Sequence, residues 1–169
     1  MNLFMFYIGG DCGNSNIELH DIRFSTGEKA EDCYDDLRRQ WWGRPESLHL
    51  DCWGKVEQAD GFNVTLSKEP APDSPLKLFF LNMGGYNPNQ FEELHKNILL
   101  VEETPHKAIV KAMKMIREWQ LPHRDAILEV EKIICVNDLF EQSGHYIHLT
   151  RAETLRPFEF ICKYVRINA

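Results

Sequence analysis

The amino-acid sequence predicts an α+β fold: a tandem duplication of a ββαββ unit, with a mainly antiparallel sheet, helices packed on it and a C-terminal extension strand. The first observation is internal similarity. Residues 3–24 align without a gap with residues 78–99 at a shift of 75, with eight of 22 positions identical. The second is that, in each copy, one segment of helical periodicity lies between short apolar or alternating segments, which are typical of strands.

The composition excludes several classes of protein. The chain has 169 residues, 19 of them basic and 26 acidic, so its formal charge is −7, and 43% of the residues are hydrophobic. These values are typical of a globular protein and unlike those of a disordered or collagen-like chain. The acidic excess argues against nucleic acid as a partner, because phosphate backbones are bound by clustered Lys and Arg. The longest apolar run, residues 3–8, is far shorter than a membrane span and lacks signal-peptide flanks, so we expect a cytoplasmic protein without a membrane partner.

The first copy contains four expected strands and one helix. We expect strands at residues 3–8, 16–26, 47–53 and 62–66, with a helix from 30 to 41 between the second and the third. Gly43 and Pro45 end the helix, because neither residue favours a further turn. Asp60 and Gly61 predict a tight turn before the fourth strand.

The second copy follows the same order. Its expected strands include residues 78–83, 126–134 and 146–149. Thr104 followed by Pro105 predicts a helix start, since Thr can cap the first turn and Pro at the first position loses no useful donor. Pro122 ends this helix.

The predicted organisation has four parts. Residues 1–67 form the first repeat, 68–75 a Pro-rich linker, 76–150 the second repeat and 151–169 a C-terminal extension. The extension is too apolar for a free tail, and its residues 158, 160 and 162 alternate in the manner of a strand. We expect it to pack either on the body of the chain or on a second copy, which would make a homodimer.

The five cysteines, at positions 12, 33, 52, 135 and 162, do not predict a disulfide framework. Their number is odd, their spacing is wide and no two of them form a CxxC pair. We interpret them mainly as small buried hydrophobic residues in a reducing compartment.

Several segments of the first copy resemble the domain of unknown function 1543 family. They are LFMFYIGG, GNSNIELHDIRF, a helix followed by WWG, then ESLHLD and DGF, in that order. The resemblance covers residues 3–66 well and residues 78–149 more loosely, so the chain is similar to a two-copy member of this bacterial family. The resemblance implies no catalytic or binding residues, because the family has no established biochemical function.

Gly9 and Gly10 are the first candidate ligand-binding residues. Glycine after a strand lets a ligand phosphate approach backbone N–H groups closely. However, no GxGxxG or GKS motif follows them, and no helix begins nearby. The alternative interpretation is a turn that needs positive φ, which glycine adopts without steric cost.

Two groups of His and carboxylate residues are the best candidates for chemistry. Glu18, His20 and Asp21 form one group, and His49 and Asp51 form the other, two residues apart and therefore on one face of a strand. Imidazole with carboxylates can bind a divalent metal, or an Asp can orient a His as a general base. The structural alternative is that the imidazoles hydrogen-bond to backbone groups.

The second copy argues against a metal. It keeps Glu93 and His95, but Lys96 occupies the position that Asp21 has in the first copy, and a cation beside a ligand disfavours a metal ion. We therefore expect no metal and no cofactor. Glu93 and His95 stay on the list of candidate ligand-binding residues.

The sequence favours a non-enzymatic binding or interaction module, because it shows no established nucleophile, phosphate loop or metal spacing. The alternative is a small enzyme with a His/carboxylate cleft between the repeats. That enzyme could be metal-dependent, because the element order βαβββ is similar to that of the vicinal oxygen chelate superfamily. Element order alone is a weak guide, since one fold hosts many functions, and whether the protein is an enzyme stays open.

Overall fold

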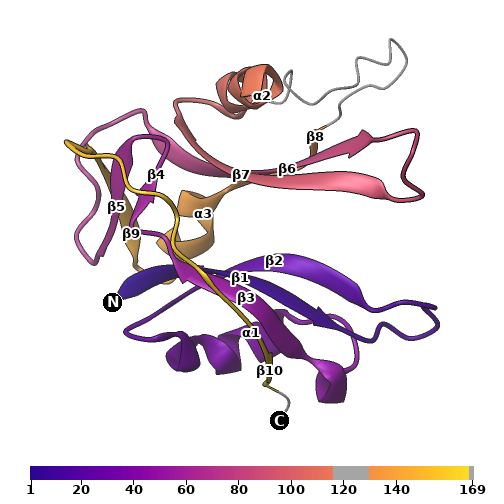
Figure 1. The fold of residues 1–169 in the computed structure, drawn as a ribbon. Coiled ribbons are helices and arrows are strands. Elements are labelled where there is room, and N and C mark those ends of the chain that lie inside the picture. The colour runs from indigo at the N-terminus through magenta and orange to yellow at the C-terminus, as the bar shows by residue number, and fades with distance from the viewer. Residues whose placement is uncertain (116–129, 168–169) are drawn as a thin grey trace. The chain divides into compact units, whose positions relative to one another are not determined.

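The computed structural model describes residues 1–115 and 130–167. These residues form an α+β structure that is mostly strand, with three antiparallel sheets and three short α-helices (Figure 1). The predicted α+β class with mainly antiparallel sheet is therefore confirmed.

The chain divides into two compact units. Unit 1 comprises Met1–Gln58 and Glu153–Ala169, and unit 2 comprises Ala59–Ala152. The C-terminal extension thus belongs to the same unit as the N-terminal strands. The last strand of the predicted first repeat, in contrast, belongs to unit 2.

Unit 1 is a four-stranded antiparallel sheet with one helical layer. Its strands are β1 (Asn2–Gly10), β2 (Leu19–Gly27), β3 (His49–Lys55) and β10 (Ile161–Arg166), in the order β10-β3-β1-β2. Helix α1 (Tyr34–Gln40) follows the 3₁₀ turn η1 (Ala30–Cys33), and a second turn, η2 (Pro45–Ser47), leads into β3. Strand β10 pairs with β3 of the same chain, whereas a homodimer through the C-terminal extension stays a prediction.

The core of unit 1 lies between this sheet and α1. Phe6 and Ile8 on β1, Leu50 on β3 and Leu37 on α1 are fully buried in it. Since successive strand residues face opposite sides, the odd-numbered neighbours on β1, including Gly9, face away from α1. The face opposite the helix is where the candidate site lies.

The predicted helix at 30–41 begins as a 3₁₀ turn and ends one residue early. Asp32 Oδ2 accepts hydrogen bonds from the backbone N–H groups of Glu28 and Lys29, both at 3.1 Å, and so caps the first turn. At the other end Trp41 is extended and buried, with its indole N–H donating to the carbonyl of Arg44.

Unit 2 contains a three-stranded sheet and a second helical layer. Its strands are β6 (Lys77–Tyr86), β7 (Glu93–Glu102) and β8 (Val130–Cys135), in the order β7-β6-β8. Helix α2 (Pro105–Met115) packs Ala108 and Ala112 into the core on this sheet. Thr104 Oγ1 accepts the backbone N–H of Lys107 at 3.2 Å, which confirms the predicted cap. The predicted C-terminal end of this helix, and residues 126–129 of the next expected strand, lie outside the described residues.

The last strands of the two predicted repeats pair with each other. Strands β4 (Gln58–Ala59), β5 (Phe62–Ser67) and β9 (Tyr146–Arg151) form a separate sheet in the order β4-β5-β9, and the short helix α3 (Val136–Glu141) precedes β9. The predicted turn before β5 is confirmed, since Asp60 and Gly61 both have positive φ. Thr65 pairs with His148, the residue that the predicted duplication makes its counterpart at the shift of 83 relating Gly61 to Gly144.

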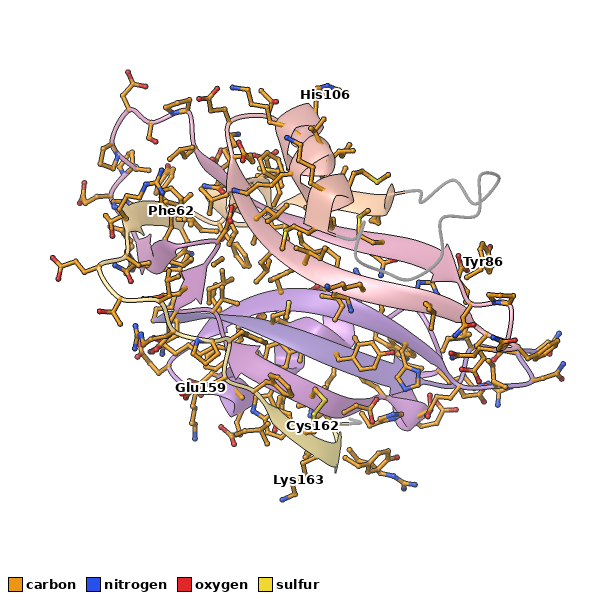
Figure 2. All side chains as sticks on the ribbon, turned by 45° about the horizontal axis from the view of Figure 1, so that its top comes forward. Phe62, Tyr86, His106, Glu159, Cys162 and Lys163 are labelled. Atoms are coloured by element: carbon orange, nitrogen blue, oxygen red, sulfur yellow. A yellow bond between two sulfur atoms is a disulfide. The ribbon has the colours of Figure 1, made fainter. Side chains whose placement is uncertain are left out.

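The interpretation of all five cysteines as unpaired hydrophobic residues is wrong for two of them. Cys52 on β3 and Cys162 on β10 form a disulfide that joins neighbouring strands (Figure 2). Their sequence separation of 110 residues hides the pairing from any spacing argument, because only the β3–β10 ladder brings them side by side. Cys12, Cys33 and Cys135 are free.

Candidate functional site

Two imidazoles converge above Gly9 on the face of the unit 1 sheet opposite α1. In the β1–β2 ladder Gly9 pairs with His20, and in the β1–β3 ladder it pairs with His49. The two histidines therefore flank the same residue of the central strand from opposite sides. Their ring centroids are 6.2 Å apart and nearly perpendicular.

Gly9 is required because the imidazoles occupy the space of a side chain. A Cβ at this position would lie 2.6 Å from His20 Cδ2 and 2.8 Å from the Nε2 atoms of both His20 and His49. Gly10 is constrained in the same way, since a Cβ there would lie 2.8 Å from Trp41 Cζ2 and from Ser47 Oγ.

The interpretation of Gly9 and Gly10 as a positive-φ turn is wrong. Both residues belong to β1, and the glycines with positive φ in the described part of the chain are Gly13, Gly61 and Gly144. Close approach of neighbouring side chains, and not backbone conformation, explains the glycines at 9 and 10.

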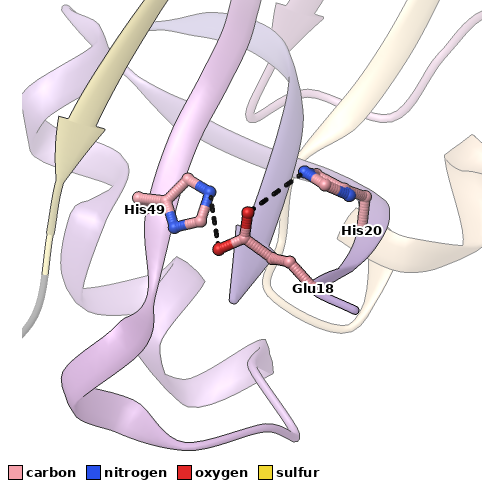
Figure 3. Close-up of side chains that lie close together, drawn as sticks. All are labelled: Glu18, His20 and His49. Carbon is pink, nitrogen blue, oxygen red and sulfur yellow. Dashed lines mark ion pairs between the residues drawn. The ribbon is translucent and has the colours of Figure 1, made fainter. Parts of the chain in front are cut away.

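Two carboxylates complete the cluster. Glu18, directly before β2, lies between the imidazoles, with Oε1 3.4 Å from His49 Nε2 and Oε2 4.0 Å from His20 Nε2 (Figure 3). Asp51 Oδ2 lies 3.0 Å from His20 Nε2 and 3.4 Å from His49 Nε2. The atoms of Glu18, His20 and His49 that could bind a metal ion all lie within 4.8 Å of one another.

Asp51 lies at a β-bulge of β3. In the β1–β3 ladder Tyr7 pairs with Cys52 and Ile8 pairs with Leu50, so Asp51 is the extra residue on β3. A bulge redirects a side chain that would otherwise alternate in a regular strand. At this bulge the Asp51 side chain lies on the same face of the sheet as His49 and contacts the Nε2 atoms of both His20 and His49.

The protonation of His49 follows from its neighbours. Its Nδ1 lies 2.9 Å from the carbonyl oxygen of Ser47, which can only accept, so Nδ1 carries a proton. The imidazole is 1% exposed, and its buried Nε2 has no hydrogen-bond partner among residues 1–115 and 130–167. The same is true of the buried Asp51 Oδ2. The site therefore contains two buried polar atoms without aligned partners, which is uncommon in folded proteins.

Two tyrosines cover the imidazoles. The Tyr7 ring stacks on His20 with centroids 5.0 Å apart, and the Tyr164 ring packs on His49 with centroids 4.5 Å apart. Burial, together with the nearby carboxylate of Asp51, raises the pKa of the Tyr7 hydroxyl, which favours its neutral form.

The remaining predicted residues lie elsewhere. Asp21 binds Arg23 at 2.7 Å and accepts the backbone N–H of Ile22, so it does not join the cluster. Glu93 and His95 belong to β7 in unit 2, where Glu93 Oε2 lies 3.8 Å from His95 Nε2. The register of β6 with β7 pairs His95 with Gly84, as His20 pairs with Gly9.

Sequence reasoning missed three residues of the site. Tyr7 lies two residues before Gly9, so strand alternation could have placed it on the same face. Ser47 acts through its backbone carbonyl, which no side-chain pattern reveals. Tyr164 comes from the C-terminal extension and could not be connected with His49 before the β3–β10 pairing was known.

The arrangement has the dimensions of a metal centre. In a tetrahedral site with metal–ligand distances of about 2.0–2.1 Å, neighbouring ligand atoms lie about 3.3 Å apart. The distances from the two imidazole Nε2 atoms to the nearest oxygens of Glu18 and Asp51 range from 3.0 to 4.0 Å. The hydrogen bond from His49 Nδ1 to a backbone carbonyl is the outer contact that orients metal-binding histidines.

A pocket of about 450 Å³ opens beside Glu18. Its walls are mainly polar and include Ser15, Ser47, Tyr164 and Arg166. Arg166 Nε donates to the Tyr164 hydroxyl at 3.3 Å. Solvent and small solutes can therefore reach the carboxylate side of the cluster.

Comparisons with known proteins show a similar solved structure and a matching family model, and neither names an activity. The chain is similar to a solved structure, the crystal structure of a protein Il1583 from Idiomarina loihiensis, with 26% sequence identity and a TM-score of 0.72 over 96% of this chain and 95% of that chain. A comparison with curated proteins finds no match. Within the described residues, no helix combines the length and the apolar character needed to cross a membrane. The family model of the Domain of Unknown Function (DUF1543) matches residues 15–66, the segment that contains Glu18, His20, His49 and Asp51.

Proposed function

We propose that unit 1 binds a divalent transition-metal ion through Glu18, His20 and His49, with Asp51 as a further carboxylate ligand. The observation that carries this proposal is the hydrogen bonding of the two ring nitrogens of His49. Nδ1 donates its proton to the Ser47 carbonyl oxygen. The buried Nε2 faces the carboxylates of Glu18 and Asp51 and has no hydrogen-bond partner among the described residues. A lone pair directed at carboxylates is unfavourable unless a cation lies between them.

The formal charge of the cluster also favours a bound divalent metal ion. Two carboxylates and two neutral imidazoles carry a formal charge of −2, which one divalent ion balances. Two protons, one on each imidazole, would balance it as well. A proton on Nε2 of His49, however, would need an aligned acceptor, and this atom has none among the residues described.

The donor set indicates the class of metal. Imidazole nitrogens with carboxylate oxygens and no thiolate suit Zn²⁺ and neighbouring first-row divalent ions, and they are poor ligands for soft ions such as Cu⁺. This makes the protein a binding module, with the metal as its ligand. The sequence-based expectation of no metal rested on Lys96, which occupies in the second copy the position that Asp21 has in the first. Because Asp21 binds Arg23 outside the cluster, a lysine at the equivalent position does not argue against a metal ion bound by Glu18, His20 and His49.

We also propose that the two halves are copies of one ββαββ unit and that the chain is a two-copy member of the DUF1543 family. The equivalent pairings of Gly9 with His20 and of Gly84 with His95 support this. The pairing of Thr65 with its own counterpart, His148, supports it as well, because a pseudo-twofold axis relates two copies in this way.

The test is a zinc titration of metal-depleted protein by calorimetry, together with metal analysis of the dialysed protein. We expect Glu18→Gln and His20→Gln to weaken the tight site by more than the 10–100-fold that loss of an outer contact costs. Both side chains are partly exposed, so the variants should fold. The matched controls are Asp21→Asn, which removes a neighbouring carboxylate, and His106→Gln, which removes an exposed imidazole on α2 (Figure 2). Unchanged zinc affinity in both Glu18→Gln and His20→Gln would overturn the proposal.

A further inference from the structure

Strand β10 is held on unit 1 by its antiparallel ladder with β3 and by further contacts at its two ends. Most of its side chains are exposed, so packing contributes little to its stability. At its C-terminal end Ile167 is buried, its N–H donates to the carbonyl of Leu48, and its carbonyl accepts Arg38 Nε at 2.6 Å. At its N-terminal end the attachment is the disulfide between Cys162 and Cys52.

Between these two attachments β10 covers the metal site. Its register with β3 shifts between Cys162 and Val165, so Tyr164 lies in an irregular step of the ladder. From that position the Tyr164 ring packs on His49, whose side chain is 1% exposed. Tyr164, which packs on the proposed metal ligand His49, therefore lies two residues from Cys162 of the disulfide.

The disulfide is open to a reductant. Cys162 is exposed at the edge of the sheet, and Cys52 is partly exposed. Cys33, in contrast, is buried, and burial raises the pKa of its thiol to about 11, which keeps it protonated and unreactive. Burial also raises the pKa of the Cys135 thiol.

We propose that the Cys52–Cys162 disulfide regulates the metal site: the oxidised form keeps Tyr164 over His49 and retains the ion, and the reduced form exchanges it. This inference rests on the proposed function. A dithiol reductant attacks one sulfur of the disulfide and then closes to its own disulfide. Two electrons and two protons pass from the dithiol to Cys52 and Cys162, and the S–S bond between β3 and β10 is broken.

The structural consequence of reduction is local. The N-terminal half of β10 loses its covalent attachment, while Ile167 continues to anchor the other end. Tyr164 then leaves His49 more often, and water reaches the Nε2 side of the site. Outer contacts of a metal site change metal affinity by 10–100-fold, so we expect release to be about 10-fold faster after reduction.

The experiment measures the rate of zinc release from the zinc-loaded full chain to a chromogenic chelator, with and without a phosphine reductant. Oxidised wild-type protein should release zinc about 10-fold more slowly than reduced protein. Cys162→Ser should release it at the reduced rate and not respond to reductant, whereas Cys12→Ser, which alters a free cysteine, should behave as wild type. Tyr164→Ala should release zinc fast even with the disulfide intact, which separates the cover from the disulfide.

The possible outcomes distinguish the two proposals. If the oxidised protein holds no zinc, the proposed function fails. If it holds zinc and releases it equally fast in both redox states, the metal site stands and the regulation is wrong. If oxidised Tyr164→Ala released zinc slowly and reduction still accelerated the release, Tyr164 would not be the residue that retains the ion.

Discussion

Replacement of Gly9 by Ala tests the packing of the site most directly. The added Cβ would lie 2.6 Å from His20 Cδ2 and 2.8 Å from both Nε2 atoms, where ordinary carbon contacts need at least 3.4 Å. Because Gly9 has no positive φ, the substitution brings no backbone strain, and the imidazoles must move instead. Overpacking of this kind costs about 1–3 kcal/mol of folding stability. Because the His20 side chain is partly exposed and can move, we expect a cost near the lower limit of this range.

The expected result is a large loss of binding with a small loss of stability. A cost of about 1 kcal/mol lowers the Tm of a protein of this size by about 2–4 °C. Zinc affinity, in contrast, should fall by more than 100-fold, because both nitrogens leave the geometry that one ion requires. Calorimetric titration measures the affinity, and thermal unfolding of the metal-free protein measures the Tm.

A matched control is Gly27→Ala. Its Cβ would lie 2.8 Å from the carbonyl oxygen of Lys29 and 2.9 Å from Asp32 Cβ, an overlap of the same size at the far end of β2. It should lower the Tm without changing zinc affinity. Wild-type zinc affinity in Gly9→Ala would show that the imidazoles do not share an ion above this residue, and the reasoning would be refuted.

Three further predictions follow from single contacts. Asp51→Asn should weaken zinc binding by at least about 10-fold in the same titration, because Asp51 contacts both imidazoles. Asp21→Asn should leave zinc binding unchanged, because Asp21 binds Arg23 and neither imidazole. Asp32→Ala should destabilise the protein by about 1 kcal/mol in urea unfolding, because two backbone N–H groups lose their acceptor, and an unchanged midpoint would contradict the cap. The Cys33 thiol has a pKa of about 11 instead of the usual 9.0, so it should resist alkylation at pH 8 in the folded protein. It should become reactive as the pH approaches 11 or when the protein unfolds, and mass spectrometry of the alkylated protein measures this.

Much of the local structure was predictable because it depends on neighbouring residues. The strands at 3–8 and 62–66, the Thr104 cap and the Asp60–Gly61 turn were predicted and are present. The candidate residues Glu18, His20, His49 and Asp51 were also found, since alternation places residues of one strand on a common face.

The glycines at 9 and 10 show where local reasoning fails. Glycine is common both where φ is positive and where another group approaches closely, and the sequence does not distinguish the two. The imidazoles that exclude a side chain at Gly9 come from β2 and β3, so the reason for this glycine appears only when both ladders are known.

By itself the sequence predicted the class of fold and drew attention to the His and carboxylate residues of the candidate site, because periodicity and residue chemistry are properties of short segments. Only the tertiary structure decided that two histidines flank Gly9, that Asp51 contacts both of them and that Tyr164 of β10 packs on His49. The disulfide was decided there too, since it joins residues 110 positions apart. The physical reason is that the choice of neighbouring strands and their register depends on packing of the whole unit, which no local pattern specifies.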